Sequence, residues 1–273
     1  MLNIIISECR DDGPAGRKLE QELARRLSER PECRVTIVPH LYDLAGDGAA
    51  IEHLQGVDGH LVVFSWLYPR AAYWVLAANK IGGRMGHTSL FPDEELEPAA
   101  TESQDGLAER TIWCIDLRSR SKPQPYVEEV EAILRATGEP AAAGSPLAAR
   151  RVEEQTVYRW YPVIDYRRCE GCLECLNFCL FGVFDLDENQ APFVDQPDVC
   201  RDGCPACARI CPSQAIMFPE HRDSALAGNG GPGKLPKKGP GHDDRRKAEG
   251  ERRRSQSPDD LDRLVDGVDG LEL

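Results

Sequence analysis

The chain has 273 residues, of which 41% are hydrophobic and 29% are charged, a composition that is normal for a soluble globular protein with a sizeable core. Its 33 Lys and Arg residues stand against 46 Asp and Glu residues, which gives a formal net charge of −13 at pH 7. This acidic balance argues against nucleic acid as the main partner, and the length suits one large domain or two ordinary ones.

The first part of the chain, residues 1–138, alternates short apolar runs with helical patterns. We predict strands at 2–6, 34–39, 59–66 and 110–117, and helices at 14–29, 49–56, 70–83 and 126–138. This order indicates an α/β three-layer sandwich on a mostly parallel four-stranded sheet. It is loosely similar to flavodoxin-like and chelatase-like domains, which bind ligands at the carboxyl ends of their strands.

No export or membrane signal is visible in these elements. The N-terminal "MLNIIISECRDD" has no basic region and no small-residue cleavage site, so it is read as a strand and not as a secretion signal. The longest apolar run, "LVVFSWLYP" at 61–69, is far shorter than the roughly 18 residues that a membrane helix needs. We therefore expect a cytoplasmic protein without a membrane span, where clustered cysteines serve metal or redox chemistry rather than disulfides.

Aromatic side chains follow the third predicted strand. Trp66, Tyr68 and Trp74 would either stack on a flavin or a tetrapyrrole, or fill the core and its rim. The chain contains no G-x-G-x-x-G and no G-x-x-x-x-G-K-[ST] sequence, so neither a dinucleotide nor a nucleoside triphosphate is indicated.

Other polar residues stand at the same strand ends. His40 follows the second strand, where a chelatase holds metal, or is a polar residue at a loop entrance. Cys9 stands where the first strand of a chelatase would need a histidine. Arg70, Arg118 and Arg120 would either bind an anion or remain solvated loop charges.

Two segments of loop and linker composition interrupt the chain. An acidic insert with prolines occupies 91–106 and indicates a loop, and 139–151 has the small residues of a linker. We therefore predict an α/β domain at 1–138, a linker at 139–151 and a second domain at 152–219.

The second predicted domain is dominated by eight cysteines with no histidine among them. Cys169, Cys172, Cys175 and Cys179 follow C-x2-C-x2-C-x3-C, and Cys200, Cys204, Cys207 and Cys211 follow C-x3-C-x2-C-x3-C before Pro212. A zinc ribbon uses two separated C-x2-C pairs instead. The flanks also repeat, since "PVIDYRRC" matches "PFVDQPDVC" and "GVFDLD" matches "AIMFPE". This duplication predicts pseudo-twofold symmetry.

These spacings make residues 158–219 resemble the bacterial-type dicluster ferredoxins, small α+β domains that hold two [4Fe-4S] clusters. The resemblance implies that Cys169, Cys172, Cys175 and Cys211 bind the first cluster. It implies that Cys200, Cys204, Cys207 and Cys179 bind the second, so that each cysteine run lends its last thiol to the other cluster. Zinc-binding or merely buried cysteines are the alternative.

The cysteine runs depart from the family pattern in two places. Leu180 follows Cys179 where the family has proline, and Arg201, Asp202 and Gly203 make the spacing after Cys200 one residue longer. The wider loop predicts a second cluster that is more exposed or different in potential. Cys200 is therefore the ligand that most needs a test.

The C-terminal part changes composition twice. Residues 220–256 are rich in glycine, proline and charge, which predicts a disordered basic tail. Residues 257–273 begin with Ser257 as N-cap and Pro258 in the first turn, followed by apolar residues at helical spacing. This pattern predicts a short amphipathic helix, either a docking peptide for a partner or a frayed end.

The sequence favours an electron-transfer protein that carries single electrons through two [4Fe-4S] clusters between redox partner proteins. Its N-terminal α/β domain would serve for docking or regulation. The cysteine domain supplies no catalytic acid, base or open metal site, so a carrier is favoured over a stand-alone enzyme. The alternatives are a redox enzyme whose N-terminal domain binds a flavin, a tetrapyrrole or a small substrate, and an iron-sulfur scaffold or sensor.

Overall fold

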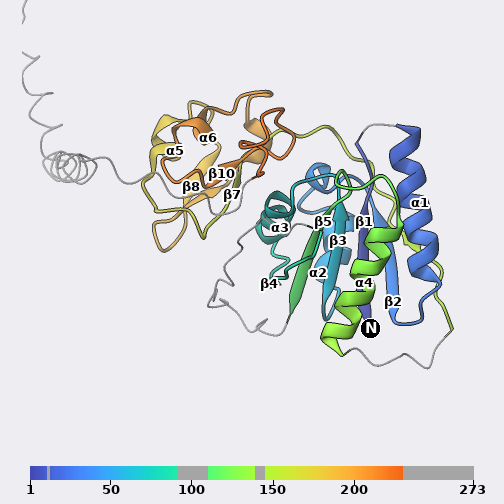
Figure 1. Ribbon diagram of the computed structural model, residues 1–273. Coiled ribbons are helices and arrows are strands. Elements are labelled where there is room, and N and C mark those ends of the chain that lie inside the picture. Colours follow the sequence, from blue (N-terminus) through green and yellow to red (C-terminus); the bar gives the residue numbers. More distant parts are fainter. Residues whose placement is uncertain (11–12, 91–109, 139–144, 230–273) are drawn as a thin grey trace, which may run out of the picture. The chain divides into compact units, whose positions relative to one another are not determined.

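The computed structural model describes residues 1–10, 13–90, 110–138 and 145–229 (Figure 1). Its central sheet has six strands in the order β4-β5-β3-β1-β2-β6, and every pairing in it is parallel. The strands are β1 (Leu2–Ser7), β2 (Cys33–Val38), β3 (Leu61–Ser65), β4 (Arg84–Met85), β5 (Thr111–Asp116) and β6 (Arg150–Arg151). The prediction of a parallel sheet is confirmed, but the number of strands is six and not four, because β4 and β6 add two residues each at the sheet edges.

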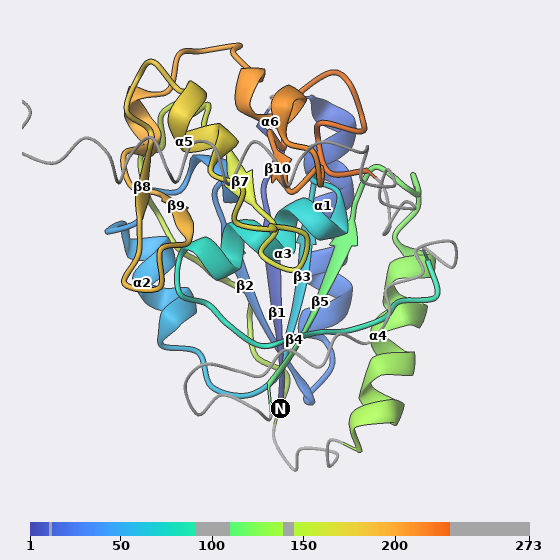
Figure 2. The ribbon, with the colours of Figure 1, turned by 90° about the vertical axis from the view of Figure 1, so that its left-hand side faces the viewer.

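Helices cover both faces of this sheet (Figures 1 and 2). They are α1 (Pro14–Ser28), α2 (Ala49–Gln55), α3 (Pro69–Ala78) and α4 (Gln124–Thr137), with a single turn η1 (Leu41–Asp43) after β2. One core joins α1 and α4 to the sheet face that carries Ile4 and Ile6, and the other joins α2 and α3 to the face of Ile5. Alternate residues of one buried strand thus serve opposite layers.

The helix ends follow local backbone chemistry. α1 begins at a proline, which suits the first helical position, and α4 ends at Gly138 in the left-handed conformation (φ 62°). α3 ends at Ala78, five residues before the predicted end, because Lys80 turns the chain with a φ of 61°.

The cysteine-bearing part consists of two matching halves. The first is β7 (Val163–Ile164), α5 (Glu174–Phe178) and β8 (Phe184–Leu186), and the second is β9 (Pro192–Val194), η2 (Pro197–Val199), α6 (Ala206–Ile210) and β10 (Ile216–Met217). β7 pairs with β10 and β8 pairs with β9, both antiparallel. Each half therefore pairs its strands with those of the other half, as pseudo-twofold symmetry requires. We call residues 158–219 the cysteine module.

Two boundaries differ from those expected from composition. Arg150 and Arg151 fall in the predicted linker, but they pair with β2 and extend the sheet. The tail is predicted from residue 220, whereas residues 220–229 are folded onto the rest: Phe218 N donates to Leu226 O at 2.8 Å, and Ala227 is buried. A few apolar residues are enough to fold this segment. They do not stand out in the composition of residues 220–256 taken as a whole.

Other predicted segments lie outside the described residues. These are the insert at 91–106, the tail from 230 to 256 and the amphipathic helix at 257–273. Over the part of the chain that the structure describes, no helix has the length and apolar character needed to cross a membrane.

Candidate metal centre

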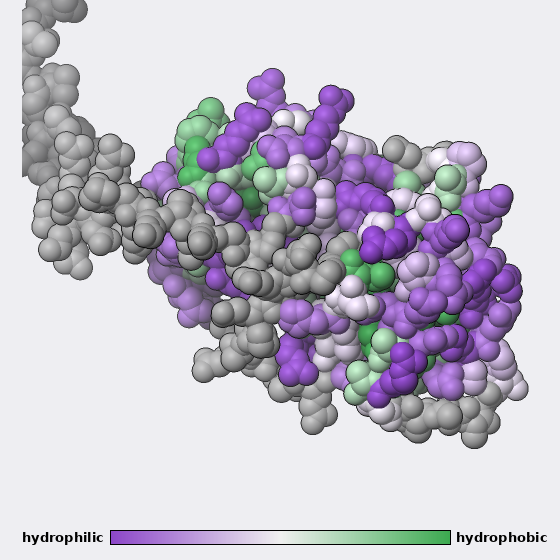
Figure 3. All heavy atoms as spheres, in the orientation of Figure 1, coloured by the Kyte–Doolittle hydropathy of each residue, from purple (hydrophilic) through white to green (hydrophobic). Residues whose placement is uncertain are grey.

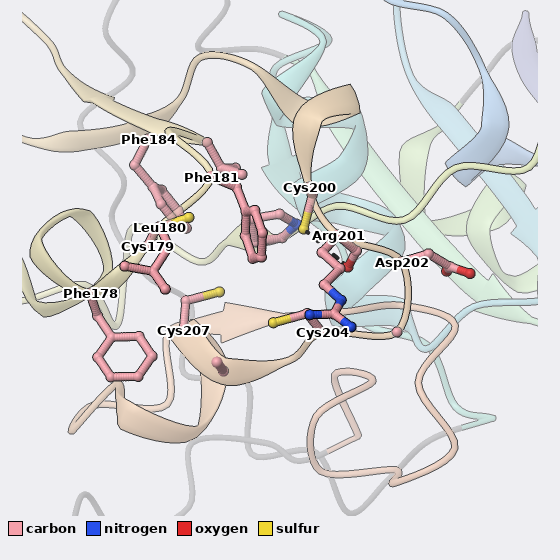
Figure 4. A pocket seen from close by; sticks show the side chains of 14 residues that line it. Phe178, Cys179, Leu180, Phe181, Phe184, Cys200, Arg201, Asp202, Cys204 and Cys207 are labelled. Atoms are coloured by element: carbon pink, nitrogen blue, oxygen red, sulfur yellow. Dashed lines mark hydrogen bonds between the residues drawn. The ribbon is translucent and has the colours of Figure 1, made fainter.

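The eight cysteines of the cysteine module surround two cavities. Cys169, Cys172, Cys175 and Cys211 line the first cavity, and Cys179, Cys200, Cys204 and Cys207 line the second. Figure 4 shows the four sulfur atoms of the second set facing a common space. Each cavity thus takes three cysteines from one run and one from the other run. The two groups coincide with the two ligand sets that the ferredoxin resemblance implies.

Backbone conformation explains how the last cysteine of each run reaches the opposite cavity. α5 and α6 are five-residue helices that pack against each other, and they carry the buried Cys175 and Cys207. Directly after these helices the chain becomes extended, with φ −70° and ψ 114° at Cys179 and φ −66° and ψ 112° at Cys211. The nearly equal angles send both side chains across the pair of helices in the same symmetric way.

The electrostatics of the cavities favour a cationic occupant. Burial, reinforced by neighbouring thiols, raises the pKa of Cys175 to about 12. Burial and the charges of Cys204 and Cys179 likewise raise the pKa of Cys200 to about 12. Four thiolates around one cavity repel each other, so they deprotonate together only when a metal group neutralises them.

The donor set fits an iron-sulfur cluster. Thiolates are soft ligands that suit iron and zinc. Here the thiols surround a cavity, and among residues 1–10, 13–90, 110–138 and 145–229 no group of three or more ligating side chains lies close enough to hold a single metal ion. A four-iron cluster, whose ligands stand around a group of atoms, matches four thiols around a cavity, and the first cavity, of about 10 Å³, would widen to take one.

Two polar groups lie within hydrogen-bond distance of a sulfur of the first cavity, and both donate to it when the thiol is deprotonated. The backbone N–H of Ala215 donates to Cys211 Sγ at 3.3 Å, and the buried Ser213 Oγ lies 3.6 Å from the same sulfur. Hydrogen bonds to ligand sulfurs are one of the ways in which a protein sets the potential of a cluster. The first cavity therefore has a side-chain donor that can be removed.

If each cavity holds an iron-sulfur cluster, replacing Ser213 with Ala is expected to lower the reduction potential of the first cluster by about 20–65 mV. A hydrogen bond contributes about 0.5–1.5 kcal/mol, about 59 mV of one-electron potential corresponds to a tenfold change, and the donor favours the more negative, reduced state. Redox titration followed by paramagnetic resonance measures the shift, and the second cluster of the same sample is the control. Equal potentials in wild type and variant would contradict the assigned hydrogen bond.

The two cavities differ in size and openness. The first has a volume of about 10 Å³, whereas the second has about 450 Å³ and opens beside Phe178, Leu180 and Phe181. The loop with one extra residue, Arg201 to Gly203, lies on the wall of the larger cavity. The second cavity is thus the more open of the two, in the direction that the longer loop after Cys200 predicts.

A buried ion pair fixes the cysteine module to the α/β layer. Arg70, in the first turn of α3, donates from Nε to Asp165 Oδ2 at 2.6 Å and from Nη2 to Gln214 O at 2.9 Å. Both charged side chains are almost completely buried. The carbonyl of Asp165 also accepts the N–H of Cys169 at 3.0 Å. Arg70 is therefore a structural anchor of the first cysteine loop. Its sequence position suggests an anion ligand or a solvated charge, and the structure shows neither.

A third cavity, of about 420 Å³, lies at the carboxyl ends of β1, β3 and β5. Cys9, Trp66, Arg118 and Arg120 line it, together with the glycines at the start of α1. The indole of Trp66 donates to Glu20 Oε1 at 2.7 Å, and Arg118 forms an ion pair with Asp116. The structure thus brings together Cys9, Trp66 and two of the three arginines that the sequence offers as anion ligands, Arg118 and Arg120.

Trp74 and His40 do not join this cavity. Trp74 is buried, with its ring against Tyr73 and Tyr166. His40 is also buried, with Nδ1 3.4 Å from Asp43 Oδ2 without hydrogen-bond geometry, and Nε2 3.3 Å from Glu220 Oε1. His40 therefore belongs to a network of charges that fastens residue 220 to the end of β2.

This network predicts a pH dependence of stability. Burial acts to lower the pKa of His40, but Asp43 and Glu220 outweigh it and raise this pKa above 6.5. Burial acts to raise the pKa of Glu220 and of Asp43, but His40 and Arg10 outweigh it and lower both. The stabilisation from a histidine with a raised pKa is fully present below about pH 6.5 and is lost as the pH rises. The stabilisation from carboxyl groups with lowered pKa values is fully present above about pH 4.5 and is lost in acid.

We therefore expect the network to contribute fully between about pH 4.5 and 6.5, and to lose stability as the pH rises above 6.5 through the raised pKa of His40. Glu220→Gln removes one of the two carboxylates facing His40, so the loss of unfolding free energy over this range should become smaller. Urea unfolding at several pH values measures it. If the free energy of unfolding falls with pH equally steeply in the wild type and in Glu220→Gln, the pair of His40 and Glu220 has no role in this pH dependence.

No protein-family model matches the chain, but three proteins are similar to about a fifth of it. An uncharacterized ferredoxin of Methanocaldococcus jannaschii is 44% identical over 64 residues, which are 23% of this chain and 43% of that protein. A ferredoxin of Methanothermococcus thermolithotrophicus is 37% identical over 59 residues, 21% of this chain and 95% of that protein.

The third relative is the subunit PorD of pyruvate synthase from M. jannaschii. It is 38% identical over 55 residues, 20% of this chain and 62% of that protein. The chain thus spans less than half of the first relative and nearly all of the second. The similar stretches are about as long as the cysteine module.

Proposed function

Because the chain belongs to the ferredoxin family over about a fifth of its length, we propose that it carries single electrons between redox proteins through two [4Fe-4S] clusters. The observation that carries this proposal is the division of eight thiols into two cavities of four. When bound, such a cluster takes up or releases one electron at a time. We assign Cys169, Cys172, Cys175 and Cys211 to one cluster, and Cys179, Cys200, Cys204 and Cys207 to the other.

The remaining residues of the module support this role. The thiols of Cys207 and Cys175, which belong to different cavities, are close enough for their charges to interact. The two cavities share an apolar core that includes Ile164, Val183 and Phe184. This core limits water around the thiols and thereby favours a defined potential. Two adjacent metal groups in one such core suit the passage of an electron from one to the other.

Metal analysis tests the proposal. Protein purified without oxygen should be brown and contain about eight irons and eight sulfides per chain, as two four-iron clusters require. Paramagnetic resonance after reduction should show two interacting centres. Colourless protein that contains zinc would contradict the proposal. Four irons per chain would mean that one cavity holds no cluster, and the second cavity, with the wider loop after Cys200, would be tested first.

We further propose that the α/β domain serves to dock or regulate a redox partner. The buried contact between Arg70 and Asp165 supports this, because it couples α3 to the first cysteine loop. One relative is by name a subunit of pyruvate synthase, so a multisubunit redox enzyme is the kind of partner that we propose. Anaerobic affinity purification from the source cells, followed by mass spectrometry, tests this. A docking role for 257–273 stays a prediction.

The cavity at the carboxyl ends of β1, β3 and β5 favours a second candidate function. In that case the α/β domain binds a flavin, a tetrapyrrole or a small anionic substrate, and the clusters supply electrons to it. Trp66 would provide the aromatic surface, and Arg118 and Arg120 the positive charge. An absorbance spectrum separates the two functions, because a flavin or tetrapyrrole band beyond the broad iron-sulfur absorbance supports the enzyme.

A further inference from the structure

An exposed apolar patch surrounds Cys179. It consists of Phe178, Leu180 and Phe181, whose exposed fractions are 52%, 92% and 41%. All three line the second cavity together with its four cysteines, as Figure 4 shows. We call these three residues the Cys179 patch. Water-exposed apolar groups gathered at a functional cavity are typical of an interaction surface.

The chain has other large exposed hydrophobic residues. Within the described ranges they are Met1, Leu147, Val157, Tyr158, Tyr166 and Val199, and none of them lines either cysteine cavity. In the space-filling view, hydrophobic atoms lie among hydrophilic ones over α5 (Figure 3). Of the large exposed hydrophobic residues in the described part of the chain, those of the Cys179 patch are thus the ones that line a cysteine cavity.

The two cavities differ in what they offer a partner. The walls of the first include the carboxylates of Glu170 and Glu174, and its volume is about 10 Å³. The second has a volume of about 450 Å³ and presents phenylalanine and leucine side chains at its surface. Electron transfer slows steeply with distance, so a partner gains most by closing on the open, apolar cavity.

The net charge of the cysteine-bearing stretch, rather than that of the second cavity's own lining with Arg201 and Asp202, indicates which partner fits. Exposed carboxylates outnumber exposed arginines between residues 169 and 211 by eight to two. The carboxylates are those of Glu170, Glu174, Asp185, Asp187, Glu188, Asp195, Asp198 and Asp202, and the arginines are Arg201 and Arg209. A surface of this sign attracts a basic protein and speeds its encounter at low salt.

We propose that electrons enter or leave this protein at the second cavity, and that the Cys179 patch docks a redox protein with an apolar centre and a basic rim. This inference rests on the proposed electron-transfer function. It assigns Phe178, Leu180 and Phe181 to partner binding, and the first cavity to the end of the relay that is farther from this partner.

Reduction of ferricytochrome c, a basic haem protein, tests this docking surface. One electron passes from the reduced protein to the ferric haem, which becomes ferrous, and no proton or group moves. Stopped-flow mixing gives the second-order rate constant, and calorimetry of the two oxidised proteins gives the Kd. For the wild type, both should weaken at higher salt, because screening removes the charge attraction.

Leu180→Ser is the first variant, since a side chain that is 92% exposed can be replaced without disturbing the core. It should slow the reduction at least threefold, and the triple variant Phe178→Ser, Leu180→Ser, Phe181→Ser at least tenfold, with a matching rise in Kd. Iron content and reduction potentials are measured for each variant. Val157→Ser, at a site 73% exposed that lines neither cavity, is the matched control and should change neither quantity.

Several outcomes would overturn the docking surface. Unchanged rate and Kd in the triple variant, an equal effect of Val157→Ser, or rates that do not depend on salt each contradict it. Self-association that the triple variant abolishes would assign the patch to a second copy of the chain instead. Wild type that holds about eight irons but neither binds nor reduces cytochrome c contradicts the docking surface alone, whereas wild type without iron contradicts the proposed function.

Discussion

Replacing Cys179 with Ala is expected to remove the second cluster and to leave the first, although Cys179 belongs to the first cysteine run. The reason is geometric, because Cys179 lines the cavity of Cys200, Cys204 and Cys207. Iron should fall from about eight to about four per chain, the contents of two and of one four-iron cluster. The resonance signal of the remaining cluster should lose its coupling to a neighbour.

Cys211→Ala is the matched variant, since Cys211 occupies the equivalent place in the second run and lines the first cavity. It should remove the first cluster and leave the second. Cys200→Ser tests the wider loop in the same way and should weaken the second cluster selectively. If Cys179→Ala instead removed the cluster of Cys169, Cys172 and Cys175, the crossed assignment would be wrong.

Arg70→Met is expected to lower the free energy of unfolding by about 3 kcal/mol, because it leaves the carboxylate of Asp165 buried without its main partner. Arg167 and Arg168 lie 3.8 Å from the same carboxylate, so the loss should fall at the lower end of the range for broken buried pairs. Urea unfolding followed by tryptophan fluorescence measures it. The first cluster should also be lost faster, because Asp165 O accepts the N–H of Cys169.

A second substitution identifies the cause of this loss. Adding Asp165→Asn to Arg70→Met removes the unpaired charge, so the double variant should recover at least half of the lost stability. Arg84→Met, at an exposed arginine of β4, is the control and should change the stability by less than about 0.5 kcal/mol. A double variant less stable than Arg70→Met would show that charge is not the cause.

The main strands and helices were predictable because they carry strong apolar periodicity. β1, β2, β3 and β5 are apolar runs of five or six residues, most of them buried. β4 and β6 carry no such signal, since each has two residues and β6 is a pair of exposed arginines. Their place at the sheet edges depends on backbone pairing with β5 and β2, which side-chain patterns do not encode.

The cysteine grouping could be predicted because the spacings resemble those of the dicluster ferredoxins, and that resemblance implies the two crossed sets. The contacts that attach the module and the segment after it could not be predicted, because they join residues distant in sequence, such as Arg70 with Asp165 and His40 with Glu220. One signal was available: Arg70 is the only charged residue in the otherwise apolar helix Pro69–Ala78. Such a residue in a buried helix is usually paired. Its partner becomes evident only when the fold is known.

The exchange of one cysteine between the two halves has a consequence for biosynthesis. When the ribosome has made the first run, the cavity of Cys169, Cys172 and Cys175 still lacks its fourth thiol, which arrives thirty-two residues later with Cys211. The cavity of Cys179 is completed only when Cys207 has emerged. Neither metal site can be finished on a nascent chain cut between the halves. A product truncated before Cys207 would therefore carry no complete set of four thiols.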